Sequence, residues 1–122
     1  GGHSRTHADL TRLDPAARED EIAGSAADLS EQLGKPVEGF AAPYGRVSPA
    51  VLESIRKHYR VAFGTRLAIA QRDDDAVDLP RIEMHYFRDR RTWSRFLDGH
   101  RGYFRMRQGL RAVREMAGGA HG

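Results

Sequence analysis

Two histidines stand four residues apart near the start of the chain, at His3 and His7. Side chains at this spacing fall on one side of a helical turn or tight loop, so both imidazoles can reach one ion. Catalytic zinc sites usually take three protein ligands and keep one position for water. Asp9 is the nearest carboxylate, and it is a candidate third ligand or outer partner of the site. Two solvent-exposed histidines that share no ion are the alternative interpretation of the same spacing.

A second segment that could do chemistry is Phe40–Arg46, an apolar run that ends in Pro43, Tyr44 and Gly45. Backbone N–H groups at the carboxyl end of a parallel strand can point outward and stabilise an oxyanion. The glycine permits a sharp turn there. Taken alone, an ordinary connection from a strand to a helix explains these residues as well. Their coincidence with the histidines makes the segment a candidate site.

The elements that must position these groups begin with a helix and a strand. Asp14 and Pro15 are typical of an N-cap and a first helical position, and Gly34 is typical of a helix end. The spacing therefore predicts an amphipathic helix over Asp14–Leu33, with an apolar stripe at Ile22, Ala26, Leu29 and Leu33. The apolar run Val37–Ala42 predicts a buried strand that ends at Pro43.

The same order of elements then repeats. Ser48 and Pro49 predict a second helix start, and Arg60–Thr65 reads as the next strand. Two consecutive helix–strand units indicate a parallel sheet. Leu79–Ile82 predicts a further short strand, which Pro80 limits to a poorly paired position.

The C-terminal part of the chain is basic. Residues 88–122 hold 9 Arg against 3 acidic residues, whereas residues 1–87 hold 11 Lys and Arg against 14 acidic residues. Asp89 predicts a helix start and Gly99 its end, and a final basic helix follows. We expect its apolar stripe to pack and its arginines to form the solvated face. The apolar positions of these two helices are Trp93, Phe96, Leu97, Tyr103, Met106, Leu110 and Val113.

Composition excludes several classes of protein. The 122 residues contain no cysteine, which excludes disulfides and cysteine-ligated metals. A mean hydropathy of −0.65 and the lack of a long apolar run argue against a transmembrane helix. The chain carries no targeting signal from which a compartment could be read.

Taken together and in order, four segments resemble the polysaccharide deacetylase family, also called the NodB homology domain. Gly2–Leu10 is similar to the family's H-[ST]-x-x-H metal motif and the D-L that commonly follows it, although Ala8 stands where many members have proline. Phe40–Gly45 is similar to its Pro-Tyr motif, and Leu33–Val37 and Leu79–Ile82 support the match. The resemblance runs from Gly2 to about Asp98, so residues 1–98 are expected to be deacetylase-like and residues 99–122 a basic helix with a frayed tail.

The resemblance implies an α/β fold, namely a distorted (β/α) barrel that binds a divalent metal ion, usually zinc. It implies hydrolysis of N- or O-linked acetyl groups on a carbohydrate polymer at the cell envelope or outside the cell. By analogy His3 and His7 would be ligands, and the Tyr44 backbone N–H would help to hold the oxyanion. Ser4 and Thr6 would be outer partners of the metal or would hold the fold of the ligand loop, and Asp9 is a further candidate for an outer partner.

The departures from the family pattern bear on activity. The family's first motif, an Asp-Asp pair that supplies the base and the third ligand, has no copy before His3. The chain therefore looks like the C-terminal portion of a deacetylase domain that lacks the first strands. Ala41 and Ala42 stand where many members have an arginine, as in a branch resembling the poly-N-acetylglucosamine deacetylases. The late leucine-x-histidine motif has no clean copy either, and His85 is the nearest candidate for the general acid.

Two other interpretations stay open. An inactive fragment or interaction module is the first, because an unpaired sheet edge would favour self-association. In the second, the arginine-rich C-terminus contacts an anionic partner. Nucleic acid is not the expected partner, since the arginines are predicted to form a solvated helix face. His58, His100 and His121 are given no role.

Overall fold

The computed structural model describes residues 1–118, which fall into two compact units, residues 1–81 and a second unit that begins at Ile82. His121 and the end of the predicted frayed tail lie outside the described residues. The predicted limit of the deacetylase-like portion, at about Asp98, stays a prediction. In chain order the elements are α1 (Pro15–Leu33), β1 (Gly39–Phe40), η1 (Pro43–Gly45), α2 (Pro49–His58), β2 (Val61–Leu67), β3 (Leu79–Arg81), η2 (Met84–Phe87), α3 (Arg90–Leu97) and α4 (Gly102–Gly118).

Helix α1 begins and ends where the sequence predicts. The Asp14 carboxylate accepts the backbone N–H groups of Ala16 and Ala17, both at 2.9 Å, and thereby satisfies donors that the helix itself cannot pair. At the other end Gly34 takes the left-handed conformation, with φ 65°, and closes the helix. The helix buries Glu21, Ile22 and Ser25, so its inner face contains a carboxylate.

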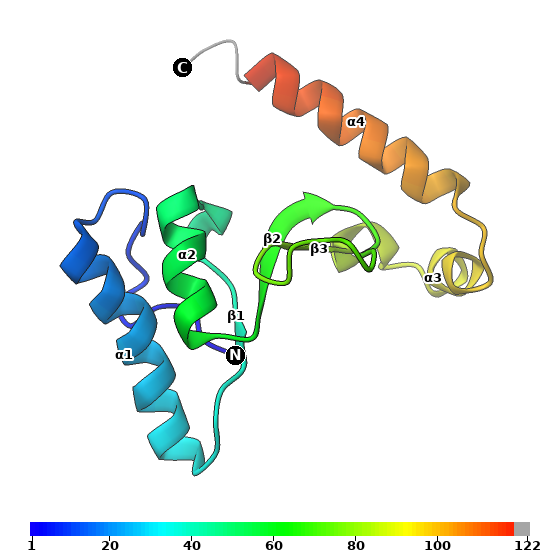
Figure 1. Ribbon diagram of the computed structural model, residues 1–122. Coiled ribbons are helices and arrows are strands. Elements are labelled where there is room, and N and C mark those ends of the chain that lie inside the picture. Colours follow the sequence, from blue (N-terminus) through cyan, green and yellow to red (C-terminus); the bar gives the residue numbers. More distant parts are fainter. Residues whose placement is uncertain (119–122) are drawn as a thin grey trace. The chain divides into compact units, whose positions relative to one another are not determined.

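The sheet of the first unit is parallel, as predicted, with the order β1-β2-β3 (Figure 1). Strand β1 is shorter than the predicted Val37–Ala42, because the chain beyond Phe40 already leads into the turn at Pro43. Strand β2 extends two residues beyond the predicted end at Thr65. The pairing of β2 with β3 is irregular between Phe63 and Leu67, in keeping with the proline in β3.

Helices α1 and α2 pack side by side in the first unit (Figure 1). A polar cluster joins them: the Ser54 hydroxyl donates to the Glu19 carboxylate at 2.5 Å, and the His58 ring also contacts that carboxylate. Both helices, strands β1 and β2 and the N-terminal segment also contribute to an apolar core. Its buried members are Leu10, Ile22, Phe40, Ala42, Val51, Ile55, Tyr59, Ala62 and Val77.

The second unit is built around a cluster of aromatic rings. The Asp89 carboxylate accepts the Thr92 N–H at 2.8 Å and caps α3, as predicted. The Phe96 ring lies 4.9 Å from that of Phe87 and 5.2 Å from that of Phe104, measured between ring centroids. Phe104 thereby fixes the first turn of α4 on η2 and α3.

The orientation predicted for α4 is wrong. Met106, Leu110 and Val113 were expected to form its packed face, yet all three are exposed. Phe104 packs in their place. Arg107 lies over the Tyr86 ring of η2, and Arg111 pairs with the carboxylate of Glu83, the residue before η2. No helix among residues 1–118 is long and apolar enough to cross a membrane.

Candidate functional site

His3 leaves the carboxyl end of a strand-like segment that pairs with β1. Gly2 donates its N–H to the Gly39 carbonyl at 2.7 Å and accepts the Ala41 N–H at 3.1 Å, in a parallel bridge opposite Phe40. The carboxyl ends of parallel strands carry the catalytic groups in barrel enzymes. His3 is therefore where a ligand of such a site belongs.

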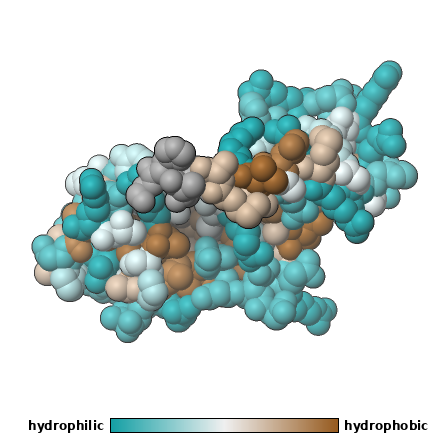
Figure 2. All heavy atoms as spheres, turned by 90° about the horizontal axis from the view of Figure 1, so that it is seen from above, coloured by the Kyte–Doolittle hydropathy of each residue, from teal (hydrophilic) through white to brown (hydrophobic). Residues whose placement is uncertain are grey.

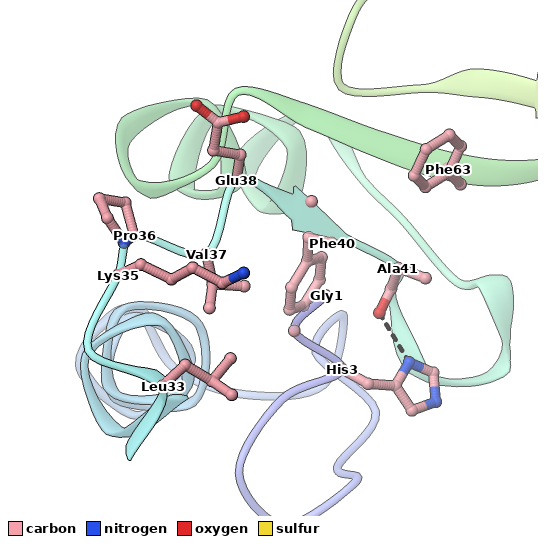
Figure 3. A pocket seen from close by; sticks show the side chains of 12 residues that line it. Gly1, His3, Leu33, Lys35, Pro36, Val37, Glu38, Phe40, Ala41 and Phe63 are labelled. Atoms are coloured by element: carbon pink, nitrogen blue, oxygen red, sulfur yellow. Dashed lines mark hydrogen bonds between the residues drawn. The ribbon is translucent and has the colours of Figure 1, made fainter. Parts of the chain in front are cut away.

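A hydrogen bond fixes which nitrogen of His3 is available. The ring Nδ1 lies 2.8 Å from the Ala41 carbonyl oxygen (Figure 3). Because a carbonyl oxygen only accepts, Nδ1 must carry the proton, and the neutral ring then keeps its lone pair on Nε2. A histidine that ligates a metal usually donates its other ring N–H to a carbonyl in this way.

The His7 ring lies against that of His3, with ring centroids 4.9 Å apart. The loop between them turns through two residues with positive φ, Ser4 and His7, each at 64°. The Ser4 hydroxyl oxygen accepts the His7 N–H at 2.9 Å and closes the turn. Such a backbone is uncommon outside glycine and clusters at functional sites.

A buried carboxylate holds this loop to α1. Glu21 accepts the backbone N–H groups of Arg5 and Thr6 at 2.8 and 2.9 Å, and the Thr6 hydroxyl at 2.6 Å. Burial raises the pKa of the Glu21 carboxyl, but the hydrogen bonds from Thr6 and Arg5 outweigh it and hold that pKa below its ordinary value. Sequence reasoning missed Glu21, although an acid one residue before Ile22 borders the buried stripe of the predicted helix.

The Arg5 side chain adds a second tie to the same helix. Its guanidinium contacts Asp20 at 3.0 Å and Asp28 at 2.9 Å. It crosses α1 at Gly24, where a Cβ atom would lie 2.6 Å from the Arg5 Cδ. The ligand loop is thus held along one face of α1, from Asp20 to Asp28.

The Pro43–Gly45 turn brings Tyr44 to the histidines. The Tyr44 ring lies 4.8 Å from the His7 ring, between centroids, and its backbone is left-handed at φ 58°. Gly45 and Arg46 donate the two N–H groups that close the turn, so the Tyr44 N–H takes part in neither bond. Gly45 is required here because a Cβ atom would lie 2.1 Å from the Thr65 Cγ2 of β2.

Asp9 lies near the site, but its carboxylate is engaged elsewhere. One oxygen accepts the Thr11 hydroxyl and N–H, and the other lies 2.6 Å from the Arg46 guanidinium. The Thr11 hydroxyl and Arg46 hold the pKa of Asp9 below its ordinary value. Asp9 and Arg46 therefore link the histidine loop to the end of the Pro43–Gly45 turn. Sequence reasoning missed this role of Arg46.

His85, the candidate acid, belongs to the second unit. Its Nδ1 lies 2.9 Å from the Arg88 guanidinium. Since arginine only donates, Nδ1 holds the lone pair in this arrangement and Nε2 carries the ring proton.

A pocket of about 570 Å³ is lined in part by His3, and His7 and Tyr44 are not among the residues that line it. It runs along β1 between the end of α1 and Phe63, and His3 lies at its rim (Figure 3). Its walls are largely apolar, with Leu33, Val37 and Phe40 among the residues that line it.

A comparison of the sequence with models of known protein families decides the family of this chain. The sequence model of the polysaccharide deacetylase family matches residues 1–62, the part that carries both histidines and the tyrosine turn. The chain belongs to the polysaccharide deacetylase family. The predicted family and the predicted partial α/β fold are thereby confirmed.

Solved structures agree with this assignment. The Streptococcus pyogenes deacetylase PplD, in complex with acetate, is 27% identical over 66% of this chain, with a TM-score of 0.63. A polysaccharide deacetylase from Bacillus cereus is 29% identical over 66% of the chain, with a TM-score of 0.59. The chain spans 36% of the first structure's length and 26% of the second's. No curated protein sequence gives a significant match.

Two residues of this chain have the chemistry that a divalent metal requires of a ligand. His3 keeps an Nε2 lone pair, and His7 lies within ring contact of it. Within residues 1–118 no group of three histidine, cysteine or acidic side chains could hold an ion. The remaining donors of a catalytic site must come from other groups.

Proposed function

We propose that this chain supplies two metal ligands and an oxyanion donor to a deacetylase that hydrolyses acetyl groups on an N- or O-acetylated carbohydrate polymer. The observation that carries the proposal is the succession of ring contacts from His3 to His7 and from His7 to Tyr44. A carbonyl-bound imidazole lies against a second imidazole, and the tyrosine ring of the Pro43–Gly45 turn lies against the latter, beyond the carboxyl end of a strand.

Each residue has a distinct task. A bound divalent ion would polarise the acetyl carbonyl and activate a water molecule, and zinc is the ion that we propose. His3 is held for ligation by the Ala41 carbonyl, and His7 by Ser4. The Tyr44 N–H donates to the acetyl oxygen as that oxygen gains negative charge.

Two further tasks complete the reaction. We assign the general base and the third ligand to the Asp-Asp motif that the family resemblance implies for the complete domain. His85 is proposed as the general acid in its imidazolium form. In that form both ring nitrogens carry protons, so the Nδ1 contact with Arg88 would have to open before Nε2 could protonate the leaving amine or alcohol. The substrate class and a site of action at the cell envelope or outside the cell rest on family membership, and the acetate bound to PplD supports the acetyl group.

The test measures acetate release from an N-acetylglucosamine oligomer by the complete deacetylase domain. His3→Ala and His7→Ala are each expected to lower kcat by at least about 100-fold, the upper range for lost groups around a metal. His100→Ala, which removes an imidazole outside the site, is the matched control and should retain activity. Full activity in both ligand variants would contradict the proposal.

A second variant separates the Tyr44 backbone from its ring. Tyr44→Gly keeps the N–H and suits the left-handed turn, so kcat should stay within about tenfold of the unaltered domain.

His85→Gln tests the general acid. The pH profile of kcat should lose its limb at alkaline pH if His85 donates the proton. An unchanged profile would exclude His85.

A further inference from the structure

Helix α4 presents an apolar stripe to solvent. Tyr103, Met106, Leu110 and Val113 follow one another at spacings of three and four residues, which places them on one helix face. They are 39, 51, 51 and 61% exposed, in that order. Exposed apolar residues scattered singly need no explanation, but a continuous stripe of them indicates a partner.

Apart from Tyr103, the stripe lies off the face by which α4 packs in its own unit. Phe104, on the other side of the helix, is only 3% exposed. Arg107 lies over the Tyr86 ring at 4.0 Å, and Arg111 pairs with Glu83 at 3.2 Å. Within the stripe, Tyr103 also contacts the Phe87 ring, with centroids 5.8 Å apart, whereas Met106, Leu110 and Val113 are at least half exposed.

Arginines border the stripe on both sides. At 100° per residue, Arg114 falls beside Tyr103 at one margin, and at the other margin Met116, 71% exposed, lies between Val113 and Arg105; both arginines are exposed. Figure 2 shows apolar residues gathered along α4 with hydrophilic residues to either side. The segment from residue 88 onward carries 9 Arg against 3 acidic residues, so the surroundings of the stripe are strongly positive.

We propose that α4 binds the surface of an anionic phospholipid bilayer, with the stripe in the interface and the flanking arginines on the headgroup phosphates. A helix with an apolar face, a basic margin and low mean hydropathy is the form that lies in a membrane interface. A second copy of the chain is a poorer occupant, because it would bring an equal positive charge to the same face. Nucleic acid would satisfy the arginines and leave the stripe in water.

The experiment is co-sedimentation of the full chain with vesicles of phosphatidylcholine, with and without phosphatidylglycerol. The unaltered chain should bind the anionic vesicles more tightly and lose affinity as salt rises. Met106→Ser/Leu110→Ser/Val113→Ser should weaken binding by at least about tenfold. Arg105→Gln/Arg114→Gln should weaken it by about 25-fold, roughly fivefold for each arginine.

The matched control is Arg12→Gln/Arg72→Gln, which removes the same charge from the first unit and should leave binding unchanged. Circular dichroism checks that each variant keeps its helices. If the triple variant loses its helices, the binding of Arg105→Gln/Arg114→Gln decides the test. Binding that is absent, that ignores the stripe, or that falls equally in the control would overturn the proposal. Dimerisation that depends on the stripe, without vesicle binding, would overturn it in favour of a second copy.

Discussion

The two units of this chain use charge in opposite ways. In residues 1–81, carboxylates turn inward and hold the candidate site: Glu21 ties down the histidine loop and Asp9 joins it to Arg46. In the second unit, aromatic rings form the interior and arginines lie at its margins or over those rings. The first arrangement preorganises a site, and the second leaves an apolar surface available to a partner.

This difference has an energetic reason. A partly buried carboxylate that accepts several N–H and O–H groups fixes a loop in one geometry, which a metal ligand requires. Stacked aromatic rings stabilise a small unit through apolar area, and they set few constraints on its outer face. If this contrast holds, the two units respond separately to mutation and to acid.

Phe104→Ala should have the largest effect on stability. Phe104 contributes a nearly buried ring to the aromatic cluster, so its loss should lower the free energy of unfolding of the second unit by about 3–5 kcal/mol. The single tryptophan, Trp93, lies in that cluster and reports its unfolding by fluorescence. If the backbone amides of β1 and β2 lost protection against hydrogen exchange by the same free energy, the two units would be one cooperative structure.

Glu21→Ala should come next. Three donors of the histidine loop lose their acceptor, which should cost about 2–3 kcal/mol of the free energy of unfolding of the first unit in urea. Glu31→Ala, at an exposed position on the same helix, is the matched control and should shift stability by less than about 0.5 kcal/mol. Equal effects would mean that the carboxylate does not hold the loop.

Acid should weaken the first unit before the second. The pKa values of Asp9, Glu19, Glu21, Asp74 and Asp75 lie below their ordinary values, whereas among the side chains that the structure describes in the second unit only Asp89 has a lowered pKa. A lowered folded-state pKa contributes stability above the unfolded-state value, and this is lost as pH falls through the folded-state value. Thermal unfolding from pH 7 to pH 3 should show the earlier loss in the first unit, and a simultaneous loss would contradict it.

Leu110→Ser should have the smallest effect on folding. Its side chain is half exposed on the stripe of α4, so the free energy of unfolding should change by no more than about 0.5 kcal/mol. A loss comparable to that of Phe104→Ala would show that the stripe is part of the folded core.

The local signals in the sequence account for much of the fold. Asp14, Ser48 and Asp89 begin helices because their side chains accept backbone N–H groups, and these contacts are encoded within three residues. The parallel sheet follows from the order of helices and strands. The grouping of His3, His7 and Tyr44 depended on the family resemblance, since the segments lie almost forty residues apart.

Contacts between distant residues were beyond local signals. The bonds from Glu21 to Arg5 and Thr6 span about fifteen residues, and no spacing rule pairs them. The orientation of α4 was also missed, because periodicity defines an apolar face without saying whether a partner covers it. There Phe104, together with Tyr86 and Glu83 as partners of the arginines, outweighed the stripe.

The most direct test of the account is a zinc titration of the chain at neutral pH by calorimetry, beside His3→Ala/His7→Ala. The matched control, His85→Ala/His100→Ala, removes the same number of imidazoles from outside the site. We predict saturable binding of one zinc ion per chain that the control retains and the double variant loses. Equal, weak binding by all three proteins would contradict the account, since His3 and His7 would then form no metal site.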